Sequence, residues 1–325
     1  MTELKDIIDP GIRPSWTKRK PLIKSLRSYQ PDTLEANVKY NARLDEKNRV
    51  NAVQIHGFLG VGRNLQFEAI ALALEGSPWF PTLAHSTAYN LFVDKLDYFW
   101  HHNFDILYPN HPNGGLNMFN VYFGILHMAY SFLLGWEEEA IYQGYLVHAA
   151  LNRKFYLILS YEEEHRRGQA FMLRLFADWR GDVSHNWPPY AYDEPIYNGL
   201  LERWRDPDPQ VLVPWLVAAC NRHTHQSGRE TSKTFYDFSV YTLIRTPIEI
   251  LMLYRLRQML GLKNPTIDHP LLEAPFDQLP TPQPKFQPDE YMQGTLARAR
   301  QDWPDFDKVT SMEAIMASPN ETRSN

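Results

Sequence analysis

The sequence predicts an all-α protein, built as a multi-helix bundle or as stacked antiparallel helix hairpins with proline-rich connecting loops. Apolar residues recur at spacings near three and four, as at Leu96, Phe99 and Trp100. No sustained alternation of apolar and polar residues indicates a strand. Short loops between successive helical stretches favour antiparallel packing of neighbours.

The helical stretches follow one another along the chain. After an irregular, basic, proline-rich arm at 1–32, the first stretch begins near residue 33 and ends among the glycines at 57–62. Further helices are expected at 64–75, 82–104, 116–136, 137–151, 155–179, 196–205, 211–222, 246–260 and 289–302. Gly76 ends the stretch at 64–75, whereas Pro247 suits a first helical turn and Gly261 a C-terminal cap.

The stretch at 116–136 is apolar enough to span a membrane by its length and hydropathy. Polar residues recur through it, however, at Asn117, Asn120 and His127. The segments on both sides have the pattern of amphipathic helices of a water-soluble protein. We therefore interpret this stretch as a buried central helix, and we expect no membrane association.

Prolines set the limits of the domain. Residues 263–288 hold too many prolines for regular structure, so they are expected to run extended over the surface before the last helix. We expect a single all-α domain over 33–302, with a subdivision near 110–116 or 181–195 left open. Residues 303–325 are expected to form a C-terminal tail.

Composition favours a folded protein that binds rather than catalyses. The chain of 325 residues holds 17 Phe, 18 Tyr and 9 Trp, which excludes global disorder, and its single cysteine excludes a disulfide framework. Residues 1–16 lack the basic-then-apolar order of a secretory signal, so a cytoplasmic location is expected. The common phosphate-binding, dinucleotide-binding, serine-hydrolase and zinc-protease motifs are all missing. We expect no catalytic residues, no cofactor and no metal.

Charge is unevenly placed. Residues 1–60 carry 11 Lys and Arg against 7 Asp and Glu, whereas residues 61–325 carry 22 against 31. An excess of carboxylates repels phosphate backbones and attracts a basic protein, so we expect a basic protein partner and no direct contact with nucleic acid. Ordinary solubility is the alternative reason for the same excess. Formation of a homodimer is left open.

Glu162 and His165 have the spacing of half a di-iron carboxylate site on a helix. This spacing gives the alternative function, a helical metal-dependent oxidoreductase that uses these two residues. No second Glu-x-x-His occurs in the chain, although such a site needs one. The competing interpretation is a pair of i,i+4 ion pairs, Glu162 with Arg166 and Glu163 with Arg167.

A second cluster, Cys220-x-x-His223-x-His225, places three metal-capable side chains near a helix end. Zinc takes four ligands, or three and a water, and no fourth ligand stands nearby in the sequence. No Asn or Asp is indicated that would orient a Cys–His nucleophile pair. A buried structural cysteine is therefore the favoured interpretation.

Two acidic triplets and an aromatic loop are the candidate contact surface for a protein partner. The triplets would steer a basic partner onto the protein, and the loop at 185–197 supplies the aromatic residue types that dominate binding hot spots. The alternatives are a solvated helix face for the triplets and packing on the protein's own core for the loop. The candidate partner-binding residues are Glu137, Glu138, Glu139, Glu162, Glu163, Glu164, Trp187, Tyr190, Tyr192, Asp193 and Glu194.

Two blocks of the sequence resemble a known family. Residues 154–204, KFYLILSYEEEHRR to NGLLERW, and residues 246–280, beginning TPIEILMLYRLRQMLGL, are similar to α-helical immunity proteins. These proteins are encoded beside polymorphic toxins in bacterial antagonism systems, notably those delivered by type VI secretion. The similarity covers about half the chain and lies in layout: a helix with a Pro-Glu type of start, an LR-x-x-x-GL end and a proline-rich segment after it.

The resemblance implies a toxin–antitoxin pair in which this chain is the inhibitor. Such a protein binds its cognate effector toxin, here expected to be a basic nuclease, in the cytoplasm of the producing cell. It neutralises the toxin by direct, stoichiometric contact. The family has no contact residue that can be carried over to a position of this chain, so the contact residues above rest on charge and residue type alone.

Overall fold

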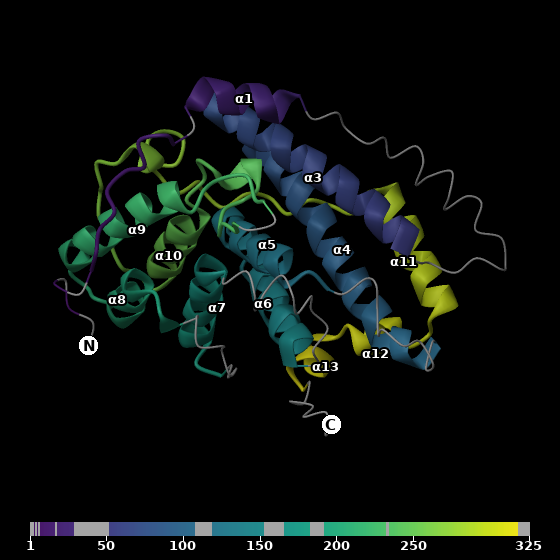
Figure 1. Cartoon of the computed structure of the whole chain (residues 1–325). Helices are drawn as coiled ribbons and strands as arrows, with labels where there is room; N and C mark the ends of the chain where they lie inside the picture. Colours follow the sequence, from purple (N-terminus) through teal and green to yellow (C-terminus); the bar gives the residue numbers. More distant parts are fainter. Residues whose placement is uncertain are drawn as a thin grey trace.

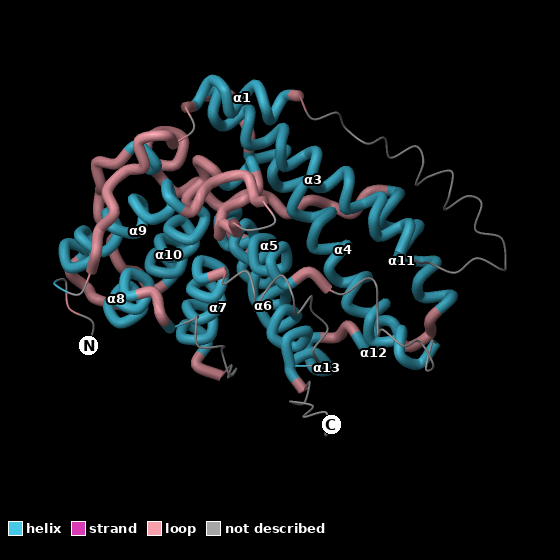
Figure 2. The backbone as a smooth tube through the Cα atoms, viewed as in Figure 1, coloured by secondary structure: helices cyan, strands magenta, loops and turns pink. Residues whose placement is uncertain are grey.

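Helices make up almost all of the regular structure in the computed structural model of the chain (Figure 2). The structure describes residues 3, 5, 7–16, 18–28, 52–107, 119–152, 166–182, 192–231 and 234–317. Within these ranges there is no strand, and the only β-type pairings are two isolated bridges, Ser227 with Phe238 and Thr231 with Thr234. The predicted all-α class is confirmed.

The helices form antiparallel pairs and groups around α5 (Figure 1). The α-helices are α1 (Arg19–Arg27), α3 (Ala52–Glu75), α4 (Phe80–Leu107), α5 (Val121–Leu134), α6 (Glu137–Asn152), α7 (Arg167–Arg180), α8 (Pro195–Arg203), α9 (Val213–His225), α10 (Ile248–Met259), α11 (Glu290–Asp302), α12 (Phe306–Val309) and α13 (Met312–Met316). Three short 3₁₀ helices join them: η4 (Pro209–Leu212), η5 (Tyr241–Leu243) and η6 (Pro270–Leu272).

The long helices α3 and α4 lie side by side as a hairpin (Figure 1). The predicted helix end at 57–62 is wrong, because α3 continues through all three glycines of that segment. A Cβ on Gly62 would lie 2.3 Å from Oδ1 of Asn90 on α4, so the glycine leaves room for this buried side chain between the two helices. Nearby, Phe58 makes edge-to-face contacts with Tyr89 and Phe92.

Helix α5 is the central helix of the protein. Every residue of α5 except Phe123 is buried, which confirms the predicted central helix within narrower bounds. The helix begins where the Asn120 side chain accepts a hydrogen bond from the Phe123 N–H, and it ends at Gly135 with φ of 75°. None of the described helices is both long and apolar enough to cross a membrane.

Helix α10 packs on α5 and α7, and two of its arginines bind carbonyl groups at the ends of other elements. Nε of Arg255 donates to the Phe132 carbonyl at 3.1 Å, and one of its terminal nitrogens donates to the Leu133 carbonyl at 2.8 Å. Arg257, fully buried, donates to the carbonyls of Trp204 and Lys263. Two of these acceptors, the Leu133 and Trp204 carbonyls, lie at the ends of α5 and α8, where helices leave carbonyls without a partner in the next turn.

The proline-rich segment between α10 and α11 has no regular structure apart from η6, as predicted, although turns and bends at 273–278 interrupt its extended course. It crosses the junction of α5 and α6, where Gln283 N–H donates to the Leu134 carbonyl at 2.8 Å and Trp136 Nε1 donates to the Gln283 carbonyl at 2.9 Å. Further on, Phe286 stacks on His85 of α4 at 4.3 Å. The segment therefore brings residues 283–286 beside the first turn of α6.

The predicted irregular arm and tail both contain packed helices. Helix α1 lies on α3, with Leu22 and Leu26 buried, so the prediction of irregular structure is wrong for 19–27. Helices α12 and α13 replace the predicted tail over 306–316 and bury Phe306 and Ile315. Each of these two helices is about one turn long, too short to give a periodic signal in the sequence.

Candidate functional site

The predicted triplet Glu137–Glu139 forms the first turn of α6. Carboxylates are favourable there because the helix dipole places partial positive charge at the N-terminus. The Lys285 ammonium pairs with two of the three, at 2.6 Å from Glu138 Oε2 and 2.8 Å from Glu139 Oε1. The hydrogen bond from Lys285 lowers the pKa of Glu138, although the Glu138 side chain remains 85% exposed.

The third member, Glu137, is exposed and lies close enough to Arg180 of α7 to influence it. Arg180 Nε donates to the Tyr145 hydroxyl at 3.1 Å, and that hydroxyl donates to Asp182 Oδ2 at 2.6 Å. The bond to Tyr145 and the carboxylates of Asp182 and Glu137 together raise the pKa of Arg180. Four carboxylates thus stand against the cations Lys285 and Arg180 and against Lys95 of the adjoining cavity, which leaves an excess of one negative charge.

A cavity of about 450 Å³ adjoins this first turn. Its walls come from α4, α6, α11, α13 and the extended segment before α11, and most of the lining side chains are apolar. The lining residues are Ala88, Leu91, Phe92, Lys95, Trp136, Glu138, Glu139, Tyr142, Lys285, Phe286, Met292 and Met312. A cavity of this size and composition falls within the range of small-molecule binding sites.

Lys95 differs from the other charged lining residues because its ammonium makes no hydrogen bond or ion pair with any residue that the structure describes. Its contacts are with two rings, 5.8 Å from the centre of Tyr142 and 5.6 Å from that of Phe306. Burial lowers the pKa of Lys95. Glu139 Oε2 is also buried without a hydrogen-bond partner among the described residues.

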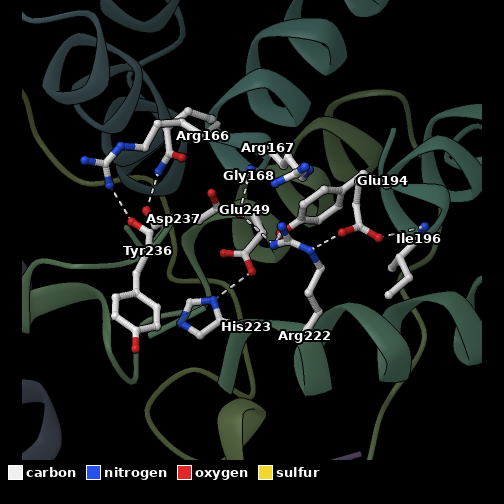
Figure 3. A network of polar contacts seen from close by, with 12 residues as sticks. Arg166, Arg167, Gly168, Glu194, Ile196, Arg222, His223, Tyr236, Asp237 and Glu249 are labelled. Carbon is white, nitrogen blue, oxygen red and sulfur yellow. Dashed lines mark hydrogen bonds and ion pairs between the residues drawn. The ribbon is translucent and has the colours of Figure 1, made fainter. Parts of the chain in front are cut away.

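The carboxylates predicted on the loop before α8 lie in a different environment (Figure 3). Arg222 of α9 donates to Glu194 and forms an ion pair with Asp237 Oδ2 at 2.7 Å. Asp237 also accepts the Gly168 N–H at 3.0 Å, at the start of α7. Glu194 accepts the Ile196 N–H at 3.4 Å and so caps α8. These contacts tie three helices and the 227–240 loop together.

Two more arginines complete this network (Figure 3). Arg167 binds both oxygens of Asp193, at 2.6 and 3.0 Å. Arg166 pairs with Glu230 at 2.6 Å and donates to the Tyr236 carbonyl. Glu194 is therefore bound within the protein by a largely buried arginine, whereas Asp193, although paired with Arg167, keeps a side chain that is 49% exposed, as exposed as Tyr192. We name this set the α7–α9 junction: Arg166, Arg167, Asp193, Glu194, Arg222, Glu230 and Asp237.

His223 lies beside the junction in a fully buried pair with Glu249 (Figure 3). Nδ1 of His223 is 2.8 Å from Glu249 Oε1, and Nε2 is 2.9 Å from the Leu243 carbonyl. A carbonyl can only accept, so Nε2 donates to Leu243 and both ring nitrogens of His223 are held within the protein.

The predicted structural role of Cys220 is confirmed, because the thiol is buried on α9 and burial raises its pKa. His223 is bound as above, and His225 Nε2 bonds to the Gly11 carbonyl at 3.1 Å. No group of three or more His, Cys, Asp and Glu in the described ranges is arranged to hold a metal ion. Glu162 and His165, on which the di-iron alternative depends, lie outside these ranges.

The structure separates the predicted site residues instead of gathering them. Asp193 binds the first residue of α7, whereas Glu137 lies near the last, Arg180. Helix α7 has 14 residues, a length of roughly 20 Å. Five further residues predicted as contacts, Glu162, Glu163, Glu164, Trp187 and Tyr190, lie outside the described residues.

Lys95 and Lys285 were missed by the sequence reasoning. Lys95 offered a weak signal, a single cation in the apolar run LFVDKL of α4. Lys285 offered none, because it sits in a proline-rich segment 147 positions from its partner Glu138. Comparison with family models, with curated proteins and with solved structures finds no match for this chain.

Proposed function

We propose that this chain is an immunity protein that binds a cognate antibacterial toxin, a basic nuclease delivered by type VI secretion, and neutralises it by direct stoichiometric contact in the cytoplasm. The observation that carries the proposal is the first turn of α6. Glu137 and Glu138 are exposed there, and the carboxylates around them outnumber the cations. Such a surface attracts a basic partner and speeds its association.

The glutamates of this surface can exchange Lys285 for a cation of the partner. An ion pair between exposed side chains contributes little, about 0–1 kcal/mol, because water and salt screen it. Lys285 can therefore yield its place on Glu138 to an arginine of the partner, which binds a carboxylate through two parallel hydrogen bonds. In the cleft of a nuclease, carboxylates held in this way occupy the positions of substrate phosphates.

The resemblance of residues 154–204 and 246–280 to helical immunity proteins supports the same function. The helical start after Pro247, the LR-x-x-x-GL end and the proline-rich segment that follows correspond in the structure to α10, Gly261 and the extended connection to α11. The resemblance indicates the class of the partner, which is a toxin. The exposed carboxylates of the α6 turn carry the negative charge that would attract a basic toxin.

The test is co-expression with the product of the neighbouring open reading frame. We expect that product to kill cells when expressed alone, to be harmless with this chain, and to copurify with it at one-to-one stoichiometry. A neighbouring product that is harmless alone, or that this chain neither binds nor neutralises, contradicts the proposal.

The contact surface is tested separately by reversing its charge. In the variant Glu137→Lys/Glu138→Lys/Glu139→Lys we expect the association rate at low salt to fall about tenfold or more, and its dependence on salt to weaken. The matched control is Asp277→Lys, a reversal at an exposed carboxylate of the extended segment after α10. Equal rates for the two variants would exclude the α6 turn as the steering surface.

A further inference from the structure

The cavity beside α6 combines an apolar wall with one cation that lacks a counter-ion. Phe92, Trp136 and Met292 contribute apolar surface, and Lys95 contributes an ammonium whose described contacts are only with aromatic rings. Lys95 is half-buried, and an ammonium that loses part of its hydration is stabilised by a paired anion. Neither of the carboxylates that line the cavity, Glu138 and Glu139, pairs with Lys95, because both are paired with Lys285.

The neighbouring charged groups already have partners. Lys285 is engaged by Glu138 and Glu139, and the carboxylate of Asp307, which influences Lys95 from α12, is held by Arg300 through two contacts at 2.7 and 3.1 Å. Glu139 keeps one buried oxygen without a donor. Because Glu138 and Glu139 also line the cavity, an anion with two negative charges would be repelled there more strongly than an anion of single charge.

We propose that this cavity is a binding site for a small organic monocarboxylate with an apolar body. The carboxylate pairs with the Lys95 ammonium, and the apolar body lies against the side chains of α4, α6 and α11. A volume of about 450 Å³ accommodates a medium-length alkyl chain or one or two rings. A phosphate is disfavoured because it carries up to two charges and needs more donors than one lysine provides.

This site goes beyond the proposed inhibition of a toxin and does not depend on it. It can be tested with the purified full-length chain by calorimetric titration with three probes of equal chain length: sodium octanoate, 1-octanol and octylammonium chloride. We expect octanoate to bind at one site, at least about tenfold more tightly than octanol, and octylammonium to bind most weakly. Equal binding of octanoate and octanol, or tighter binding of octylammonium, would overturn the proposal.

Two lysine variants locate the site. In Lys95→Met, which keeps an apolar side chain of similar length, we expect octanoate affinity to fall about tenfold or more, to the level of octanol, while octanol affinity is unchanged. The matched control is Lys308→Met, which removes an exposed lysine of α12 and should leave both affinities as they are. Unchanged octanol binding by Lys95→Met shows that the cavity is intact, and retention of the preference for octanoate in this variant refutes the assignment.

Discussion

The two ends of α7 use charged residues in opposite ways. At its start, the α7–α9 junction holds Arg222 between two carboxylates, and Arg222 and Asp237 are almost completely buried. At its end, beside the first turn of α6, the paired residues Lys285 and Glu138 are 45% and 85% exposed. The two sets have similar residue types and similar distances, so burial is what separates them.

Burial determines which set can meet a partner. A buried arginine with two carboxylates cannot leave them without exposing uncompensated charge to a medium of low dielectric, so the junction acts as a structural joint. An exposed lysine with two glutamates exchanges partners at little cost. This difference is the reason to assign partner contact to the α6 turn and a structural role to Glu194, whose pair with Arg222 is largely buried. Asp193 pairs with Arg167 at the exposed edge of the junction, so burial does not decide its role.

The stabilising role of the α7–α9 junction is tested most directly by replacing Arg222. In Arg222→Met, Glu194 and Asp237 lose their cation, and we expect the free energy of unfolding to fall by about 3–5 kcal/mol. Urea unfolding followed by circular dichroism measures the change. The matched control is Arg229→Met, an exposed arginine just after α9, with an expected change within about 0.5 kcal/mol. Equal stability of the two variants would show that the α7–α9 junction does not stabilise the fold.

Close packing at the same end gives the next largest effect. A Cβ on Gly199 of α8 would lie 1.8 Å from Cζ3 of Trp215, a buried ring on α9 that cannot move aside without disturbing its neighbours. We expect Gly199→Ala to lower the free energy of unfolding by about 1–3 kcal/mol. Gly294→Ala is the control, because a Cβ there meets no atom within 4 Å and α11 gains helix propensity. A smaller loss for Gly199→Ala than for its control would contradict the packing argument.

Much of the fold could be predicted because the relevant signals are local. Prolines, caps and helical periodicity placed α4, α5, α6, α10 and α11 within a few residues, and the helix predicted at 289–302 is α11, for which Asp289 is the N-cap. The errors have physical causes. The glycines of α3 resemble a helix end in sequence, but Gly62 accommodates the buried Asn90 side chain of α4, a distant contact that no local pattern encodes. The single-turn helices α12 and α13 owe their stability to tertiary packing.

The candidate site was less predictable because it depends on distant contacts. The acidic turn of α6 is evident in the sequence, whereas its pairing with Lys285 and the adjacent cavity arise only when the extended segment returns across α6. Asp193 and Glu194 have the same appearance in sequence as Glu137 and Glu138. Arg222 of α9 buries most of Glu194 in the junction, whereas Arg167 of α7 holds Asp193 at its exposed edge, and this difference is a property of the packed structure.

A smaller, pH-dependent effect is expected at His269, which contacts α9 near the same junction. Nδ1 of His269 accepts the Leu271 N–H at 3.0 Å, and Nε2 bonds to Asn221 Oδ1 at 3.1 Å, so the ring is neutral. Burial lowers the pKa of His269 below its usual 6.5. The unfolded chain then takes up the proton more readily, so the stability that His269 contributes is complete above pH 6.5 and is lost as the pH falls below it.

This dependence is measured by urea unfolding at pH 7 and at pH 5. The variant His269→Asn keeps an oxygen that can accept the Leu271 N–H but does not titrate. We expect the wild-type chain to lose more stability between the two pH values than the variant. Parallel losses in the two proteins would mean that His269 does not contribute to the pH dependence.

The smallest effect on stability is expected at the exposed ion pairs beside the first turn of α6. Lys285→Met removes the cation shared by Glu138 and Glu139, yet we expect the midpoint of urea unfolding to stay within experimental error, because such exposed pairs often contribute nothing measurable. The same variant leaves the first turn of α6 more negative, so association with a basic partner should become faster at low salt. A clear loss of stability would show that this turn stabilises the fold, as the α7–α9 junction does. The reason to assign partner contact to α6 would then be lost. A stable variant with faster association would show that the two ends of α7 differ in role. The charged residues at its start would then stabilise the fold, and those at its end would recognise the partner.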